Sequence, residues 1–129
     1  MNAIANLSPQ IVWKNFYDLT QIPRPSKFEQ EAAKYICDFG KNLGLESFQD
    51  EVGNVIIRKP ATPGMEDRMG IILQAHIDMV PQKNNDVEHD FKKDPIKPRI
   101  VDNMVYATGT TLGADNGLGC AVAMAVLES

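Results

Sequence analysis

The sequence predicts an α/β domain with a mixed sheet, and three features of the chain lead to that prediction. Two segments in the first third repeat apolar residues at helical spacing, short strand-like segments bounded by turn residues occupy the middle, and a segment rich in small residues closes the chain as a helix. The expected order is two helices, three strands, a long loop, two strands and a helix. The 129 residues suffice for one domain.

Two helices are expected before the first strand. The first is predicted to start with Ser8 as N-cap and Pro9 as its first residue, and to stop at the proline-rich stretch 22–25. The second is predicted to start at a capping box, residues 26–29, and to end before Gly44, a natural left-handed C-cap. Its apolar stripe consists of Phe28, Ala32, Ile36, Phe39 and Leu43.

A hairpin and a buried strand are expected next. Residues 46–51 and 54–59 are predicted to pair around a turn at residues 52 and 53, and the stretch 61–68 reads as a loop. Residues 69–75 (MGIILQA) form a continuous apolar run. Such a run is typical of a strand buried on both faces of a sheet.

The last part of the chain is predicted as loop, hairpin and helix. Residues 80–97 are polar and without periodicity, which indicates a loop. Residues 99–101 and 104–107 are expected to pair around Asp102 and Asn103. Residues 116–127 contain alternate alanines and read as a helix suited to close packing on a sheet.

The charge and the hydropathy of the sequence indicate which classes of partner to expect. The formal net charge is −4 and no basic stripe is present, so nucleic acid is not expected as a partner. No apolar run approaches the roughly 20 residues that span a bilayer, and the N-terminal residues do not resemble a signal peptide, so no membrane association is expected. Cys37 and Cys120 form no CxxC pair and are expected to be buried thiols in a reducing cytoplasm.

A histidine and an aspartate directly follow the apolar run. His76 and Asp78 would lie at the carboxyl end of the strand, where open α/β sheets bind ligands. Strand alternation places both on one face, with Ile77 toward the core. A neutral imidazole there can bind a metal while the carboxylate orients it. The same short pattern also fits a structural histidine beside a solvated aspartate, so spacing alone leaves both interpretations open.

Residues 109–119 contain four glycines between a predicted strand and a predicted helix. Glycine at this density indicates backbone that turns tightly or approaches another group closely. No Lys-Ser/Thr follows, which excludes a P-loop, and residues 117–119 lack the third glycine of a dinucleotide fingerprint. Asp115 remains, either as a carboxylate for a divalent cation or as the N-cap of the last helix.

A second histidine lies in an acidic stretch. His89 is surrounded by Asp86, Glu88 and Asp90, which together could attract a cation. No buried strand or tight turn organises these groups in the sequence. A solvated loop is therefore the favoured interpretation of residues 86–90.

The stretches 74–79 (QAHIDM) and 113–117 (GADNG) resemble the M20 family of metallopeptidases. The similarity includes residues 52–60 (VGNVIIRKP) and 73–96 and extends from about Leu7 to the last residue. Within that family the chain looks most like bacterial cytosolic dipeptidases that cleave Xaa-His. The resemblance implies that residues 1–129 are the N-terminal part of a three-layer α/β/α catalytic domain of the zinc-exopeptidase type.

The resemblance also implies a role for each candidate residue. His76 would bind one zinc ion, Asp115 would bridge two zinc ions, and Asp78 would be the catalytic-site carboxylate that supports His76. The Asp115–Asn116 peptide would be cis. A complete site would hold two Zn²⁺, with Mn²⁺ or Co²⁺ as alternatives, and would hydrolyse small peptides, preferentially Xaa-His such as β-Ala-His. The whole enzyme would be a homodimer.

Residues 1–129 do not match every part that the family uses. The adjacent Glu-Glu pair, which would supply the general base and a zinc ligand, has no counterpart, and Glu128 does not fit it. Further ligands, the rest of the catalytic domain and the lid or dimerisation domain are also absent from this chain. The isolated chain is therefore expected to be inactive. Two alternatives stay open: a non-catalytic homologue that serves as a binding or folding module, and an M20 peptidase or deacylase with another substrate.

Overall fold

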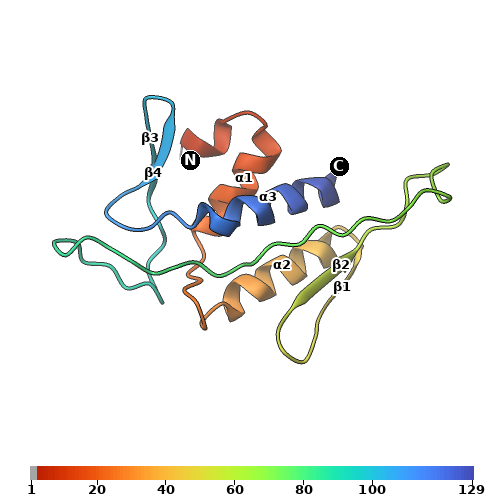
Figure 1. Ribbon diagram of the computed structural model, residues 1–129, viewed down its shortest axis with the longest axis horizontal. Helices are drawn as coiled ribbons and strands as arrows, with labels where there is room; N and C mark the ends of the chain where they lie inside the picture. Colours follow the sequence, from red (N-terminus) through yellow and green to blue (C-terminus); the bar gives the residue numbers. More distant parts are fainter. Residues whose placement is uncertain (1–2) are drawn as a thin grey trace.

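The structure, a computed structural model, describes residues 3–129 (Figure 1). These residues contain a 3-10 helix, three α-helices and two β-hairpins, joined by loops. Their bounds are η1 Ala3–Asn6, α1 Gln10–Thr20, α2 Gln30–Asn42, β1 Glu46–Gln49, β2 Val55–Arg58, β3 Pro98–Val101, β4 Met104–Ala107 and α3 Ala114–Glu128. The predicted α/β class is confirmed. None of the helices within residues 3–129 is long and apolar enough to cross a membrane.

Helices α1 and α3 pack against each other along an apolar seam. Phe16 of α1 and Ala121 of α3 are fully buried there, together with Ile4 of η1. Phe16 also meets Trp13 edge to face, with ring centroids 6.0 Å apart. Full burial of one Phe or Ile side chain stabilises a fold by about 1.5–3 kcal/mol. The seam therefore holds α3 in a defined place against α1.

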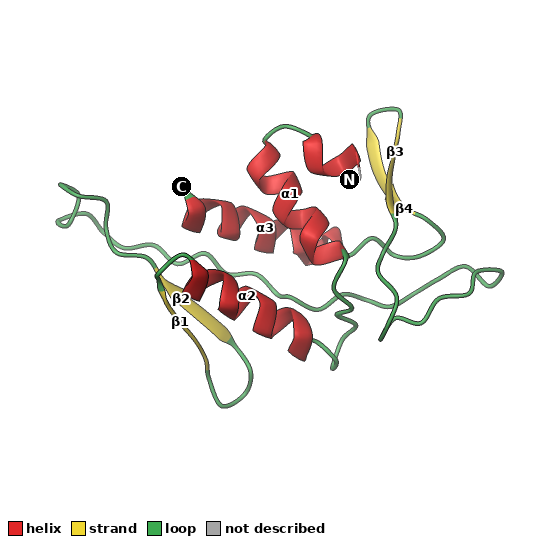
Figure 2. Cartoon of the chain, turned by 180° about the vertical axis from the view of Figure 1, so that it is seen from behind, coloured by secondary structure: helices red, strands yellow, loops and turns green. Residues whose placement is uncertain are grey.

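A second cluster joins the three α-helices around the segment that carries His76. Its buried members are Leu19, Ile36, Cys120 and Met124. Ala75 and Ile77 pack on this cluster from the extended segment, which Figures 1 and 2 show running between α2 and α3. Both sequence neighbours of His76 are thus anchored against the core.

The strands form two separate antiparallel hairpins, not the single mixed sheet that was expected. β1 pairs with β2 and β3 pairs with β4, as the two predicted hairpins require. Gly53 and Asp102 have positive φ values of +93° and +53° in the connecting turns. Among the described residues, parallel pairing is limited to one isolated bridge between Pro25 and Met79. The mixed sheet is absent here because each strand bonds only to its neighbour in sequence.

The prediction of a buried strand at residues 69–75 is wrong. The segment is extended, but it pairs with no other strand in the described part of the chain. Met69, Ile71 and Ile72 are 93%, 83% and 94% exposed. An extended backbone becomes a strand only when another strand satisfies its N–H and C=O groups. The apolar pattern therefore identified an extended segment correctly but could not show whether a partner strand exists.

This exposed apolar segment is expected to make the isolated chain self-associate, because large exposed apolar patches and unpaired extended backbone promote association. Gel filtration with light scattering should then show species heavier than the 14.3 kDa monomer. Ile72→Lys should shift them toward the monomer. Val52→Lys, at a side chain that is 79% exposed in the β1–β2 turn, is the control and should change nothing. A monodisperse wild-type monomer would contradict the prediction.

The predicted helix ends agree with the structure at some positions. α1 begins at Gln10 with Pro9 as N-cap, one residue later than predicted, so Ser8 lies outside the cap. Leu43 is the C-cap of α2, and Gly44 follows it with φ +75°, which confirms the left-handed glycine predicted at the end of this helix. The final helix is confirmed and is longer than predicted, since it starts at Ala114 and includes a kink at residues 115 and 116.

The capping box predicted at residues 26–29 does not form. α2 starts at Gln30 with Glu29 as N-cap, and no side chain caps it. Ser26 instead donates its hydroxyl to Asp78 Oδ2 at 2.5 Å. A hydrogen bond to a carboxylate is stronger than one between neutral groups, and Lys27, with φ +76°, turns the chain away from cap geometry. The serine is therefore part of the candidate site.

Candidate metal site

The structure brings all three predicted site residues together. Asp78 Oδ1 lies 3.0 Å from His76 Nδ1, and Asp115 Oδ1 lies 3.0 Å from His76 Nε2. The imidazole therefore lies between two carboxylates. His76 and Asp78 share a face while Ile77 packs on the core, as predicted, although the segment is not a strand.

This arrangement favours positive charge at the imidazole. A neutral imidazole has one N–H and can donate to only one of the two carboxylates. The Asp115 carboxylate, followed by that of Asp78, raises the pKa of His76. The Ser26 hydroxyl, followed by His76, lowers the pKa of Asp78. Between His76 Nε2 and Asp115, the site is thus suited to either a proton or a metal cation.

The donor set fits a divalent metal. When Nδ1–H is donated to Asp78, His76 Nε2 directs its lone pair toward Asp115, as in carboxylate–histidine–zinc arrangements. Two ligands of one tetrahedral zinc ion stand about 3.3 Å apart, and the observed separation is 3.0 Å. The Asp115 side chain is 94% exposed, so its carboxylate is accessible to a second cation as well. Within residues 3–129, no three His, Cys, Asp or Glu side chains surround a common metal position.

The backbone at the start of α3 presents Asp115 to this site. Gly113 is the N-cap of α3, with φ +78°, a region of backbone conformation that favours glycine. Asp115 and Asn116 depart from helical φ/ψ values, and the peptide between them is cis, as the M20 resemblance implies. The Asp115 carboxylate contacts the His76 ring, and this contact favours the ligand interpretation of Asp115 over the N-cap interpretation.

The glycine-rich stretch closely approaches Arg24. A Cβ atom on Gly113 or Gly117 would lie 2.7 Å from Arg24 Nη2. The Arg24 side chain is buried, with the residue only 1% exposed. The close approach predicted from glycine density is thus confirmed, and the group approached is a guanidinium of the same chain.

Backbone hydrogen bonds join the segment after Asp78 to the glycine-rich stretch. The Thr111 N–H donates to the Gln82 carbonyl at 2.8 Å, and the Asn84 N–H donates to the Gly109 carbonyl at 2.9 Å. These bonds hold the segment that carries His76 beside the one that carries Asp115.

Two further side chains hold the His76 segment, and neither was predicted to do so. Ser26 bonds the Asp78 carboxylate, and the Cys120 thiol donates to the His76 carbonyl at 3.3 Å. Burial raises the pKa of the Cys120 thiol and keeps it protonated as a donor. Both cysteines are free and buried, as predicted. The contacts join residues 52 and 44 apart in sequence, so no local pattern could reveal them.

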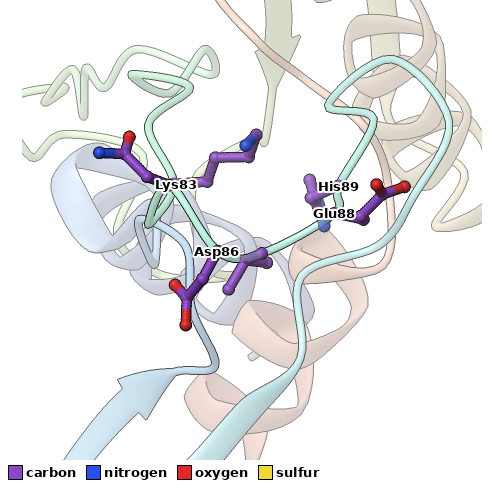
Figure 3. A pocket seen from close by; sticks show the side chains of 6 residues that line it. Lys83, Asp86, Glu88 and His89 are labelled. Atoms are coloured by element: carbon purple, nitrogen blue, oxygen red, sulfur yellow. The ribbon is translucent and has the colours of Figure 1, made fainter.

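The acidic stretch around His89 does not form a comparable site. Lys83, Asp86, Glu88 and His89 line an open hollow of about 340 Å³, in which the Asp86 and Glu88 side chains extend in different directions (Figure 3). Both carboxylate residues are exposed. The His89 ring contacts Phe91 edge to face, with centroids 4.5 Å apart. The exposed carboxylates agree with the predicted solvated loop, but His89 is half-buried and its Nε2 has no hydrogen-bond partner in the described part of the chain.

Glu128 lies far from the site. Its Oε1 accepts a hydrogen bond from Asn15 Nδ2 at 2.8 Å, which ties the end of α3 to α1. A helix rises about 1.5 Å per residue, so Glu128 is about 16 Å along the axis from Gly117. This carboxylate therefore cannot reach the position between His76 and Asp115.

No family model matches the chain. The cytosol non-specific dipeptidase of Escherichia coli is 55% identical to it over 127 residues, which are 98% of this chain and 26% of that protein. The crystal structure of aminoacylhistidine dipeptidase from Vibrio alginolyticus matches it with a TM-score of 0.96 and 53% identity. That match covers 99% of this chain and 26% of the Vibrio chain. This chain is homologous to a segment of these dipeptidases.

A third similarity is more distant. Aminopeptidase PepT from Bacillus cereus is 26% identical in the matched part, with a TM-score of 0.70, over 95% of this chain and 32% of that one. The homologues are thus peptidases. This chain spans about a quarter of the length of the two dipeptidases.

Proposed function

We propose that this chain contributes His76, Asp78 and Asp115 to the two-zinc site of a dipeptidase that prefers Xaa-His substrates such as β-Ala-His. His76 Nε2 and the Asp115 carboxylate would hold the metal, and Asp115 would be a ligand of both ions. Zinc in such a site supplies Lewis acidity toward the scissile carbonyl and an activated water. Mn²⁺ or Co²⁺ would be the alternative metals.

The observation that carries this proposal is the position of the His76 ring between two carboxylates, at 3.0 Å on each side. In the neutral imidazole whose Nδ1–H donates a hydrogen bond to Asp78, the Nε2 lone pair is directed toward Asp115. Ser26 in turn holds the second oxygen of Asp78. Two successive hydrogen bonds therefore support the orientation of the ring, and in its neutral form they favour the tautomer that leaves Nε2 free for a metal.

The remaining groups of the site lie outside residues 1–129 in this proposal. The general base and further zinc ligands come from the part of the dipeptidase that the present chain does not match. The complete enzyme is proposed to be a cytoplasmic homodimer, in line with the word cytosol in the name of the Escherichia coli relative. The isolated chain should hydrolyse no dipeptide, because two ligands cannot hold a two-metal site.

A chimera tests this function. The present chain replaces the segment that it matches in the Escherichia coli dipeptidase, and hydrolysis of β-Ala-His, Gly-His, a dipeptide without histidine and a tripeptide is measured with zinc present. The intact Escherichia coli enzyme is the positive control. The chimera is expected to hydrolyse the dipeptides, and the Xaa-His substrates fastest. A chimera that has the size and circular dichroism of the parent but cleaves none of the substrates would leave the non-catalytic module as the better account.

A further inference from the structure

The Arg24 guanidinium contacts both segments that carry the candidate ligands. Its Nη1 donates to the Ile77 carbonyl at 2.9 Å, and its Nη2 donates to the Gly113 carbonyl at 2.9 Å. Ile77 lies between His76 and Asp78, and Gly113 lies two residues before Asp115. One side chain thus connects the backbones that position all three site residues.

The backbone of Arg24 strengthens this connection. The Arg24 carbonyl accepts a hydrogen bond from the Met79 N–H at 3.0 Å, and Ser26 N–H donates to the Met79 carbonyl at 3.2 Å. Residues 24–26 therefore lie alongside residues 77–79, with the isolated parallel bridge at Pro25 between them. This pairing fixes the origin of the Arg24 side chain relative to the His76 segment.

A buried guanidinium is an unfavourable choice for packing alone. Arg24 is 1% exposed, and its Nε has no hydrogen-bond partner in the described part of the chain. Burial lowers the pKa of Arg24, but a guanidinium stays protonated in proteins. Moving such a cation out of water costs several kcal/mol, and an apolar side chain of similar volume would avoid that cost. The charge and the two N–H donors therefore point to a role beyond filling space.

The chemistry of this position calls for arginine in particular. A guanidinium is planar and presents its N–H groups in a fixed fork, whereas a lysine ammonium is a single point. The fork directs two separate nitrogens, Nη1 and Nη2, at carbonyls on different segments, whereas an ammonium would have to bond both carbonyls from one nitrogen. Gly113 and Gly117 leave the space for it, since a Cβ on either would lie 2.7 Å from Nη2.

We propose that Arg24 is a positioning residue, which sets the placement of the Asp115 segment relative to His76 and Asp78 through its hydrogen bonds to the Ile77 and Gly113 carbonyls. In this role Arg24 acts through the two backbone segments that it bonds. Its meaning for catalysis rests on the zinc site proposed above. The positioning itself can be measured without metal, through the contact between His76 Nε2 and Asp115.

The first test reads the histidine rings in the 129-residue chain by ¹⁵N–¹H NMR without metal, in an Ile72→Lys background that suppresses association. His76 and His89 are the only two histidines, so His89 is an internal reference. Arg24→Met should remove the signature of hydrogen bonding at His76 Nε2 and leave His89 unchanged, and Arg24→Lys should retain part of it. Arg58→Met, at an exposed arginine paired with Glu46, is the matched control and should change neither ring.

A folded Arg24→Met chain with wild-type His76 signals would overturn the inference. If Arg24→Met does not fold, Arg24→Lys decides: wild-type His76 signals in that variant also overturn the inference, and a partial loss supports it. Circular dichroism and the His89 signals establish the fold in each case. A purely structural role would change the unfolding midpoint without changing the His76 ring in the folded chain.

The second test measures Zn²⁺ affinity in the chimera by competition with a chromophoric chelator. Arg24→Met should weaken zinc binding by about 10- to 100-fold, as loss of groups that orient metal ligands commonly does. Unchanged affinity would overturn the positioning role at the metal. If the chimera without substitutions binds no zinc, the proposed function fails, while the ring spectra of the metal-free chain still decide the role of Arg24.

Discussion

Alanine at His76 is expected to remove most dipeptidase activity from the chimera and to lower its zinc content. The ring lies between Asp78 and Asp115, where it can supply a nitrogen ligand. Metal polarisation contributes several kcal/mol to the transition state, and each 1.36 kcal/mol changes the rate tenfold. The expected loss in kcat/KM is therefore about 10²–10³-fold or more. Zinc content is measured on the same samples by atomic emission.

The control for this substitution is His89→Ala, which removes the other histidine of the chain from a loop outside the site. It should keep both activity and zinc near the level of the unsubstituted chimera. Asp115→Asn complements the test, since it keeps the shape of the side chain but removes the charge that two metal ions would share. A site variant that kept full activity would show that the residue substituted in it is not a zinc ligand.

Alanine at Gly117 is expected to weaken both the fold and the metal site. The new Cβ would lie 2.7 Å from Arg24 Nη2 and 3.1 Å from Phe16 Cε1. Because both side chains are buried and closely packed, neither can move aside freely. Overpacking of this kind costs about 1–3 kcal/mol. Displacement of the guanidinium should also lower zinc affinity by about 10- to 100-fold.

Gly70→Ala is the matched control, because a Cβ at that exposed position would have nothing within 4 Å. Urea unfolding and zinc competition are measured for both variants in the chimera. Gly70→Ala should change neither the unfolding midpoint nor the zinc affinity appreciably. If Gly117→Ala kept wild-type stability and zinc affinity, the position of the Arg24 guanidinium would not depend on the absence of a side chain at residue 117.

Local chemistry made much of the fold predictable. The two hairpins follow from strand-like stretches around Gly53 and Asp102, and the end of α2 follows from Gly44. The two motifs also placed His76, Asp78 and Asp115 as candidates, because alternation puts His76 and Asp78 on one face and the glycine-rich turn presents one carboxylate. Each of these predictions depends on residues close together in sequence.

What could not be predicted depends on distant contacts. The apolar run at residues 69–75 indicates an extended segment. Its sequence does not show whether a partner strand bonds its backbone N–H and C=O groups, and in the described part of the chain none does. Ser26 matches a helix cap equally well, and only the position of Asp78 diverts its hydroxyl. Arg24, between two prolines, shows no local sign of its contacts with residues 53 and 89 positions away.

Zinc-edge anomalous diffraction from crystals of the zinc-loaded chimera tests the central claim most directly. We expect anomalous peaks within about 2.0–2.2 Å of His76 Nε2 and of the Asp115 carboxylate, with Asp78 still bonded to His76 Nδ1. No peak beside His76 and Asp115, or zinc bound only by other residues, would contradict the assignment of this chain to a two-zinc site.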